Sequence, residues 1–500
     1  MKFKFQIFEK FKLEIITFIS GAVVMVLEIV GSRILSPYLG NSIFIWSSLI
    51  GVILGSLSLG NWFGGFISDK KASLKVLSSI LFYSSIAIFI LTIIKDIILF
   101  IVADKLEITQ ASILLGIILF APSSIFLGMV SPYVIKLKLK DLKTSGETVG
   151  FLYALSTMGS IFGTFLAGFI LISYVGTNGV LILLSVILVF LALFADSEFW
   201  VGRKLVAILV LIISIYQIKG QEDSLKNTGY IDKDTNYNRV IIYESIDKTT
   251  GRPVRALSQD RQSSSAMFLD GDDLVYEYTK YYNLFSHFKP DFKNTLMIGG
   301  AAYSYPKEFL KKYPDSNIDV VEIDPEITSL AVKYFNLKED ENLKIIHQDG
   351  RVFLNQNEMK YDVIFGDAFS SLHTVPFHLT TLECVKKIYD SLVVDGVYIA
   401  NVISAVNGDK SDFFQSEFRT ISEVFPQVLV FRVKDVGLSE NQNLILVALK
   451  TKKEFSKVSE DNEINSYLSR QYDYKNDKQG LILTDDFAPV ERFSLKTLSF

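Results

Sequence analysis

Long apolar runs dominate the first 219 residues of the chain, whereas short apolar and polar segments alternate in the remainder. A run of about 18 or more apolar residues is long enough to cross the ~30 Å hydrocarbon core of a bilayer as a helix. The amino-terminal region is therefore expected to be a multi-span α-helical membrane domain. We predict about seven spans, near residues 13–35, 43–65, 74–94, 110–135, 147–172, 177–195 and 203–218.

The rest of the chain follows a different pattern. Residues 220–236 are polar and predict a linker, and residues 237–292 predict a small β element and a helix. Between residues 293 and 500, strands and helices alternate, which predicts an α/β domain with a mostly parallel sheet and helices on both faces. Strands are expected near 294–298, 318–322, 343–347, 361–366, 394–402, 426–432 and 442–449, and helices near 304–313, 325–335, 378–391 and 411–423.

Lysines gather on one side of the predicted spans. The positive-inside rule then places the amino terminus in the cytoplasm and makes this a multi-pass protein of the cell membrane. The seventh run is the shortest, at about 15 residues. As a crossing it would place residues 220–500 outside the cytoplasm, and as an interfacial segment it would leave them inside. The lysines are Lys2, Lys4, Lys10, Lys12, Lys70, Lys71, Lys75, Lys136, Lys138, Lys140 and Lys143.

Glycines four residues apart mark the second and fifth spans. This spacing places small residues on one helix face and lets helices approach closely, so the spans are expected to anchor or assemble the protein. Glu28 is an ionisable residue inside the first span, and it is either a functional group or a partner of Arg33. The glycines are Gly51, Gly55, Gly60, Gly64, Gly65, Gly159, Gly163 and Gly168.

Charge and cysteine content narrow the choice of partners. The net charge of -4 gives no reason to propose nucleic acid as a partner. The single cysteine, Cys384, excludes an internal disulfide bond. A small-molecule substrate and the lipid bilayer are the expected partners, and a homodimer is an open alternative. We expect no metal and no cofactor apart from the substrate.

A glycine pair and an acidic residue predict a nucleoside site. The buried strand Thr295–Ile298 ends in Gly299 and Gly300, which let the backbone turn tightly and approach a ligand. About 20 residues later a second strand ends in Glu322, where a carboxylate can bind ribose hydroxyls. The alternative is a role near the helix N-cap. Asp324 before Pro325 already fills that role, which leaves Glu322 available for ribose.

Two further acids follow strands. Asp349 follows the third predicted strand and is either a helix N-cap or the acceptor of a hydrogen bond from an adenine amino group. Asp367 follows the fourth strand, in Tyr361-Asp-Val-Ile-Phe-Gly-Asp367. Ligands bind at the carboxyl ends of parallel strands. Three acids at successive strand ends therefore favour a shared site over three solvated loop residues.

These residues resemble the spermidine synthase (polyamine aminopropyltransferase) family, which has a Rossmann-like, methyltransferase-type fold. The resemblance runs from Asn236 to about Lys450, and the whole chain resembles the membrane-fused subgroup of that family. The matching motifs are Tyr237-Asn-Arg-Val, Phe268-Leu-Asp-Gly271, Tyr278, Ile298-Gly-Gly300, Val321-Glu-Ile-Asp324, Gln348-Asp-Gly350, Tyr361-Asp-Val-Ile-x-x-Asp367, Val375-Pro-Phe-His-Leu-Thr-Thr381 and Leu483-Thr-Asp-Asp486.

The resemblance implies an activity and roles for residues. Family members bind decarboxylated S-adenosylmethionine, transfer its aminopropyl group to putrescine and release methylthioadenosine. By resemblance, Glu322 binds ribose and Asp349 binds adenine. Asp367 takes the proton of the attacking amine, and Tyr278 orients that acceptor. The matched motifs place further substrate-binding residues at Gly299, Gly300, Ile323, Gly350 and Asp270.

Two positions depart from the family pattern. Ala302 and Ser370 stand where the family has aspartates. A diammonium substrate in a partly buried site needs counter-charges, because an unpaired buried charge is costly. The departures therefore predict a changed amine or none. Intact S-adenosylmethionine could instead react through its own carboxylate and give homoserine lactone, aided by intramolecular orientation.

The sequence is compatible with more than one function. The main prediction is a membrane-embedded, spermidine-synthase-like transferase that cleaves the S–Cγ bond and releases methylthioadenosine. The carbon fragment is either transferred to putrescine, giving spermidine, or cyclised or hydrolysed without an amine. Three further classes compete with this prediction: a methyltransferase, a transporter with a nucleotide-sensing domain, and an inactive binding module.

Overall fold

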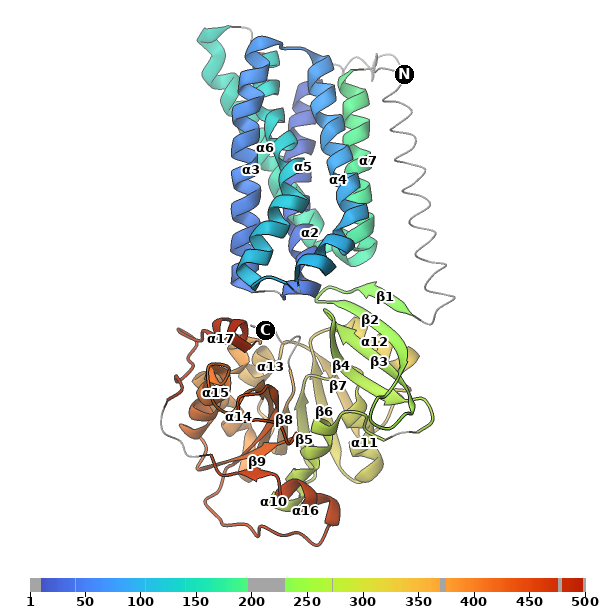
Figure 1. The fold of residues 1–500 in the computed structure, drawn as a ribbon, viewed down its shortest axis with the longest axis vertical. Helices are drawn as coiled ribbons and strands as arrows, with labels where there is room; N and C mark the ends of the chain where they lie inside the picture. Colours follow the sequence, from blue (N-terminus) through green and yellow to red (C-terminus); the bar gives the residue numbers. More distant parts are fainter. Residues whose placement is uncertain are drawn as a thin grey trace. The chain divides into compact units, whose positions relative to one another are not determined.

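The computed structural model describes residues 10–40, 42–103, 105–139, 141–196, 230–271, 273–368, 375–474 and 479–497. It divides into two compact units (Figure 1). Unit 1 comprises Met1–Thr228 and Lys233–Asn236, and unit 2 comprises Gly229–Asp232 and Tyr237–Phe500. Each unit is described by itself.

Unit 1 is a bundle of long apolar helices. Six helices of the described residues are long and apolar enough to cross a membrane, as predicted, while the seventh predicted run, 203–218, lies outside the described residues. A π-helical turn, η2 (Ala167–Leu171), follows the fifth helix, and Gly176 interrupts the sixth with a φ of +71°. The helices are α2 (Lys12–Leu39), α3 (Ile43–Lys70), α4 (Leu74–Ala103), α5 (Ile108–Lys138), α6 (Ser145–Leu166) and α7 (Ile172–Ala195).

Glycines mediate two of the helix contacts in unit 1. A Cβ atom on Gly159 of α6 would overlap the carbonyl oxygen of Phe18 on α2, and one on Gly60 of α3 would overlap that of Ile125 on α5. These pairs allow the backbones to approach closely. Gly51, Gly55, Gly65 and Gly168 have open space at the same position, so the spacing identifies only part of each packing face.

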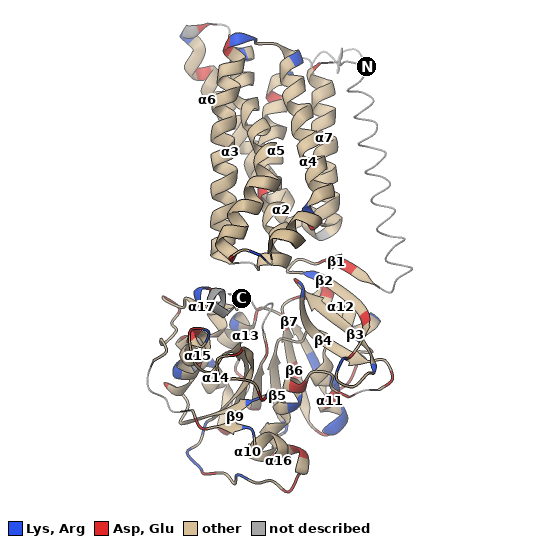
Figure 2. Ribbon diagram, viewed as in Figure 1, with Lys and Arg blue, Asp and Glu red and all other residues tan. Residues whose placement is uncertain are grey.

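Charged residues of unit 1 lie mainly near the helix ends (Figure 2). Lys138 pairs with Glu14 at 2.6 Å, and Lys136 with Asp69 at 2.7 Å. Lys95 of α4 is buried and pairs with its neighbour Asp96 at 2.7 Å. Glu28 is half-buried within α2. This distribution fits helices whose middle segments are surrounded by an apolar medium.

Unit 2 contains a small four-stranded sheet with the order β1-β2-β3-β4. Its strands are β1 (Ile231–Asp234), β2 (Arg239–Ile246), β3 (Pro253–Gln259) and β4 (Gln262–Phe268). The prediction of a linker over residues 220–236 is wrong near its carboxyl end, because Ile231–Asp234 form strand β1. Three short helical segments follow: α9 (Glu277–Lys280), η3 (Tyr281–Leu284) and α10 (Phe285–Phe288).

The main sheet of unit 2 has eight strands in the order β12-β10-β11-β9-β8-β5-β6-β7. Strands β5 to β9 pair in parallel, while β10, β11 and β12 pair antiparallel at one edge. The sheet is thus mixed. Its strands are β5 (Asn294–Ile298), β6 (Asn317–Glu322), β7 (Leu343–His347), β8 (Tyr361–Gly366), β9 (Leu392–Ser404), β10 (Gln427–Arg432), β11 (Gln442–Leu449) and β12 (Gln471–Tyr472).

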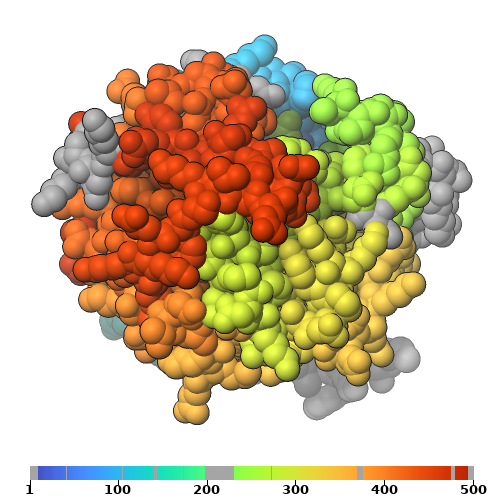
Figure 3. Space-filling view, turned by 90° about the horizontal axis from the view of Figure 1, so that it is seen from below, coloured from blue at the N-terminus to red at the C-terminus, as the bar shows by residue number. Residues whose placement is uncertain are grey.

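Helices cover both faces of the main sheet. One apolar cluster joins the sheet to α13, α14, α15 and α17, and another joins it to η3, α10, α11 and α16. Figure 3 shows a face on which the red chain around α16 lies beside the yellow-green segment that contains η3. The helices are α11 (Ser304–Lys312), α12 (Pro325–Tyr334), α13 (Gly350–Gln356), η4 (Phe377–Leu379), α14 (Leu382–Ser391), α15 (Asp412–Ser422), α16 (Asn462–Leu468) and α17 (Val490–Thr497).

Strand order reverses between β5 and β8, and ligands bind open α/β sheets at such a switch point. Six described helices that are long and apolar enough to cross a membrane, followed by an α/β domain, confirm the predicted fold class.

Candidate functional site

The loop after β5 lies at the switch point. Gly299 has a φ of +95°, and a Cβ atom there would overlap the carbonyl oxygen of Asp367. The backbone N–H of Asp367 donates to the carbonyl oxygen of Ile298 at 3.0 Å. Only glycine adopts this conformation without strain, and only glycine leaves room for the end of β8. Gly299 therefore holds the two strand ends together.

Glu322, at the end of β6, binds the same loop. Its Oε2 accepts hydrogen bonds from the N–H groups of Gly300 (2.9 Å) and Ala301 (3.0 Å), and its Oε1 accepts one from Asp324 (3.0 Å). Burial raises the pKa of this carboxyl, while the three backbone donors oppose the shift. Each carboxylate oxygen accepts about two hydrogen bonds, so Oε1 retains capacity for a ligand. Ribose binding stays a prediction.

Backbone strain is concentrated in this loop. Ala301 and Tyr303 have φ values of 44° and 57°, a region that non-glycine residues rarely occupy. Tyr303 is fully buried, and its hydroxyl forms a 2.7 Å hydrogen bond with Thr328. The Thr328 hydroxyl in turn lies 2.9 Å from Nε2 of His347. Strained residues persist where the surroundings fix them, and such places are often ligand sites.

Asp349 is the N-cap of α13. Its Oδ1 accepts hydrogen bonds from the N–H groups of Arg351 (2.9 Å) and Val352 (3.0 Å), and its Oδ2 lies 3.1 Å from Nε2 of His378. The alternative that Asp349 caps a helix is therefore confirmed, but capping uses only Oδ1 of its carboxylate. Gly350 approaches the side chain of Ile298 too closely for a Cβ atom. The adenine role of Asp349 stays a prediction.

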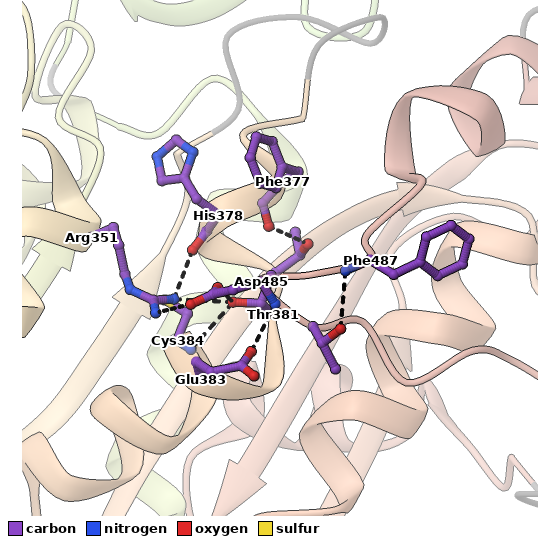
Figure 4. Close-up of polar contacts among 10 residues, drawn as sticks. Arg351, Phe377, His378, Thr381, Glu383, Cys384, Asp485 and Phe487 are labelled. Atoms are coloured by element: carbon purple, nitrogen blue, oxygen red, sulfur yellow. Dashed lines mark hydrogen bonds and ion pairs between the residues drawn. The ribbon is translucent and has the colours of Figure 1, made fainter.

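A polar network connects this helix to the carboxyl-terminal segment (Figure 4). Arg351 donates to the His378 carbonyl oxygen at 3.1 Å and to the Thr381 hydroxyl at 3.0 Å, and pairs with Asp485 at 2.7 Å. The Thr381 hydroxyl also donates to Asp485 at 2.6 Å. Two motifs about a hundred residues apart in sequence thus meet, and the network fixes the backbone that carries His378.

Asp367 follows β8 and has partners on two sides. Asn401 donates to its Oδ1 at 3.0 Å, and the hydroxyl of Tyr278 donates to its Oδ2 at 3.3 Å. Burial raises the pKa of Asp367, and these hydrogen bonds oppose the shift. Burial and the charge of Asp367 raise the pKa of Tyr278 well above its ordinary value, so its hydroxyl is neutral.

Asn401 is itself held in one orientation. Its Oδ1 accepts a hydrogen bond from Asn443 of β11 at 2.9 Å, and its side chain is 2% exposed. Reversing its amide would turn an acceptor toward the Asp367 carboxylate. Sequence reasoning missed Asn401, Asn443 and His378. The only feature of the sequence that marks Asn401 is that a polar amide interrupts the apolar run of β9.

Aromatic rings line one side of Asp367. The ring of Tyr278 lies 6.1 Å from that of Tyr276 and 5.9 Å from that of Tyr282. Tyr237, which is 42% exposed, lies near the other acids, because the charges of Asp324, Asp349 and Glu322 contribute to the raised pKa of its phenol after burial. Exposed and half-buried rings beside the strand ends provide surfaces for a flat or cationic ligand.

The remaining predicted residues lie in different surroundings. Ile323 is 37% exposed directly after Glu322, which suits contact with a ligand. Asp270 follows β4 and pairs with Arg252 at 2.8 Å. Ala302 is fully buried, and its N–H donates to Ser265 at 3.1 Å. Ser370 lies outside the described residues. Substrate contacts of these residues stay predictions.

Comparison with known proteins gives one consistent family. The family described as "Spermine/spermidine synthase domain" matches residues 279–455. A polyamine aminopropyltransferase from Vibrio vulnificus is 28% identical over 222 residues, which are 41% of this chain and 70% of the relative. Another from Streptococcus uberis is 32% identical over 176 residues, which are 33% of this chain and 59% of the relative.

Solved structures of similar description also match. A probable spermidine synthase from Corynebacterium glutamicum is 24% identical, with a TM-score of 0.41, and the match covers 54% of this chain and 93% of that one. Residues 279–455 of the present chain match the spermine/spermidine synthase domain, and the helical amino-terminal region is consistent with the membrane-fused subgroup of that family.

Proposed function

We propose that this protein is a membrane-embedded transferase that binds S-adenosylmethionine or its decarboxylated form in unit 2. It cleaves the S–Cγ bond and releases methylthioadenosine. The arrangement around Asp367 carries the proposal, because it provides a half-buried carboxylate beside a glycine loop, with Asn401 and Tyr278 as fixed donors. The names of the relatives support the same reaction class.

The nucleoside would lie across the carboxyl ends of β5, β6 and β7. Glu322 has acceptor capacity left for ribose hydroxyls, and Asp349 for the adenine amino group. Ile323 offers an exposed apolar surface for the base. This placement directs the sulfonium toward Asp367, since β5 and β8 are neighbours in the sheet.

The reaction is a displacement at Cγ. A nucleophile forms a bond to Cγ while the S–Cγ electron pair passes to sulfur, so the sulfonium becomes the neutral thioether of methylthioadenosine. With an amine as nucleophile, the nitrogen loses a proton, and Asp367 is placed to accept it. A raised pKa suits a group that must take up a proton near neutral pH.

The acceptor can be an amine, the substrate's own carboxylate or water. An amine fits the relatives and the proton acceptor at Asp367. The substrate's own carboxylate would give homoserine lactone and needs no proton acceptor, since the carboxylate attacks as an anion. This second route is favoured by Ala302, whose buried methyl group provides no counter-charge for a diamine where the family has an aspartate.

Product analysis tests the proposal. Purified protein would be incubated with S-adenosylmethionine or its decarboxylated form, each with and without putrescine, and the products identified by mass spectrometry. We expect methylthioadenosine with at least one sulfonium, and little from Asp367→Asn where an amine is the acceptor. Methylated product with no methylthioadenosine would indicate a methyltransferase. Formation of spermidine from putrescine and the decarboxylated substrate, with no consumption of intact S-adenosylmethionine, would rule out the amine-independent route.

A further inference from the structure

A cavity lies on the α14 and α15 side of the main sheet, next to Asp367. Its volume is about 30 Å³, which is room for a small group. Gly366 and Ala368, on either side of Asp367 in the chain, both line it, as does Asn401, which donates to Asp367. The cavity therefore adjoins the candidate site from the opposite side of the sheet to Tyr278, whose ring packs with the other apolar cluster.

Glu417 of α15 is the one acidic side chain among the lining residues, and no basic side chain lines the cavity. It is 5% exposed, and its Oε2 has no hydrogen-bond partner among the described residues. An unpaired carboxylate in such a place is costly to ionise. Burial alone raises its pKa to about 8. We name this space the Glu417 cavity.

The charge of Glu417 acts on Tyr398 of β9 and Cys384 of α14, whose own pKa values are raised mainly by burial and partly by that charge. Arg351 of α13 acts on Cys384, and it is already engaged by Asp485. The other elements packed against α15, namely α17, β10 and β11, contribute no charge to the pKa of Glu417 among the described residues. The carboxyl is thus left without a cation.

The chemistry of the walls selects a ligand class. A lone carboxyl cannot hold a divalent metal, and the part of the chain that is described has no group of three His, Cys, Asp or Glu placed for one. The hydroxyl groups of Thr380 and Tyr398 can accept N–H donors, and Ile388 and Ala400 offer apolar contact to methylene groups. A primary alkylammonium group has the charge, donors and methylene stem that match these walls.

We propose that the Glu417 cavity is a subsite for an alkylammonium group of the substrate, with Glu417 as its counter-charge. The inference rests on the proposed function. The ammonium could come from the amino-acid part of intact S-adenosylmethionine or from a diamine acceptor. In either case α15 supplies a carboxylate that the glycine loop, with Ala302, does not.

Binding should be coupled to proton release. With a pKa of about 8, the empty site is mainly protonated at neutral pH, and an ammonium ligand favours the ionised form. The affinity therefore rises with pH, by up to about tenfold per unit below the pKa, and levels off above it. If Glu417 contacted only water in the cavity, its titration would not make the affinity for an ammonium ligand depend on pH.

Calorimetry on the full-length protein in detergent tests the proposal. The ligands are methylthioadenosine, which has no ammonium group, S-adenosylmethionine, and putrescine in the presence of methylthioadenosine. The variant is Glu417→Gln, which keeps the shape of the side chain, and the matched control is Glu423→Gln, an exposed glutamate at the end of the same helix. Titrations run at pH 6.5 and 7.5, where an α-amino group with a pKa of about 8 is still largely charged.

We expect Glu417→Gln to bind methylthioadenosine normally, which also shows that it is folded. It should bind one of the two ammonium ligands at least tenfold more weakly at pH 7.5 and lose the pH dependence of that affinity. Loss for S-adenosylmethionine identifies the amino-acid ammonium, and loss for putrescine identifies the acceptor. Unchanged affinity for both overturns the inference. Failure of the wild type to bind methylthioadenosine would instead contradict the proposed function.

Discussion

At the scale of single residues, the hydrogen bond from Asn401 influences the pKa of Asp367. The amide of Asn401 cannot reverse while Asn443 donates to its oxygen, so it must donate to Asp367. This hydrogen bond favours the ionised carboxylate, whereas burial favours the neutral acid. The balance between the two sets the pH at which Asp367 can accept a proton.

Replacing Asn401 should therefore change the pH profile. Asn401→Leu removes the donor, so the pKa of Asp367 rises further and the acid limb of kcat/KM moves to higher pH. We expect a loss of roughly tenfold at pH 6 that recovers at alkaline pH, as for one hydrogen bond to a charged group. Asp367→Asn, without the titrating group, should be slow at every pH, by about 10²–10⁴-fold. A uniform loss in Asn401→Leu would indicate a purely structural role.

Glu322 should contribute to binding of the nucleoside. Glu322→Ala removes the proposed acceptor for ribose, two backbone contacts of the glycine loop and one backbone contact of Asp324. Calorimetry with methylthioadenosine should show binding weaker by about 1.5–3 kcal/mol, as for charge-assisted hydrogen bonds. Glu341→Ala, at an exposed position, is the matched control. Equal affinity in both variants would remove Glu322 from the ligand site.

At the scale of elements, close packing of α2 and α6 depends on glycine. Gly159→Leu would force a side chain against the carbonyl oxygen of Phe18, whereas Gly150→Leu, on the same helix, meets open space. We expect the first variant to destabilise the protein by about 1–3 kcal/mol or more, the usual cost of overpacking. Thermal unfolding in detergent measures this cost. A similar midpoint for both variants would mean that α6 can shift away from α2.

The elements themselves were largely predictable from sequence, because apolar period and strand-end chemistry are local signals. Strands β5 to β9 and the placement of Glu322, Asp349 and Asp367 at their carboxyl ends follow from those signals. The antiparallel edge was not predicted, since strand direction depends on connections that alternation does not encode. Glu417 and the link between Thr381 and Asp485 depend on tertiary packing alone, so no local pattern marks them.

At the scale of the whole molecule, the question is whether unit 1 transports or anchors. Unit 1 contains a pocket with a volume of about 190 Å³, lined by small polar and apolar residues. No charged side chain is among its lining residues: Thr17, Ser20, Gly21, Val24, Leu57, Asn61, Leu127, Gly128, Val130, Ser131, Tyr153, Ser156 and Ser160. Coupled transport of a charged substrate generally uses ionisable groups inside the membrane. The pocket therefore gives no basis for ion coupling.

We accordingly expect unit 1 to anchor the enzyme without moving its substrate. Protein reconstituted in sealed proteoliposomes should release methylthioadenosine from labelled S-adenosylmethionine but accumulate no label above protein-free vesicles. Glu28 lies in α2 and is not among the residues that line the pocket, so Glu28→Gln should leave turnover within about twofold of the wild type, as for substitutions away from a site. Label uptake that Glu28→Gln abolishes would show that the bundle carries substrate and that Glu28 takes part, and the anchoring interpretation would then be wrong.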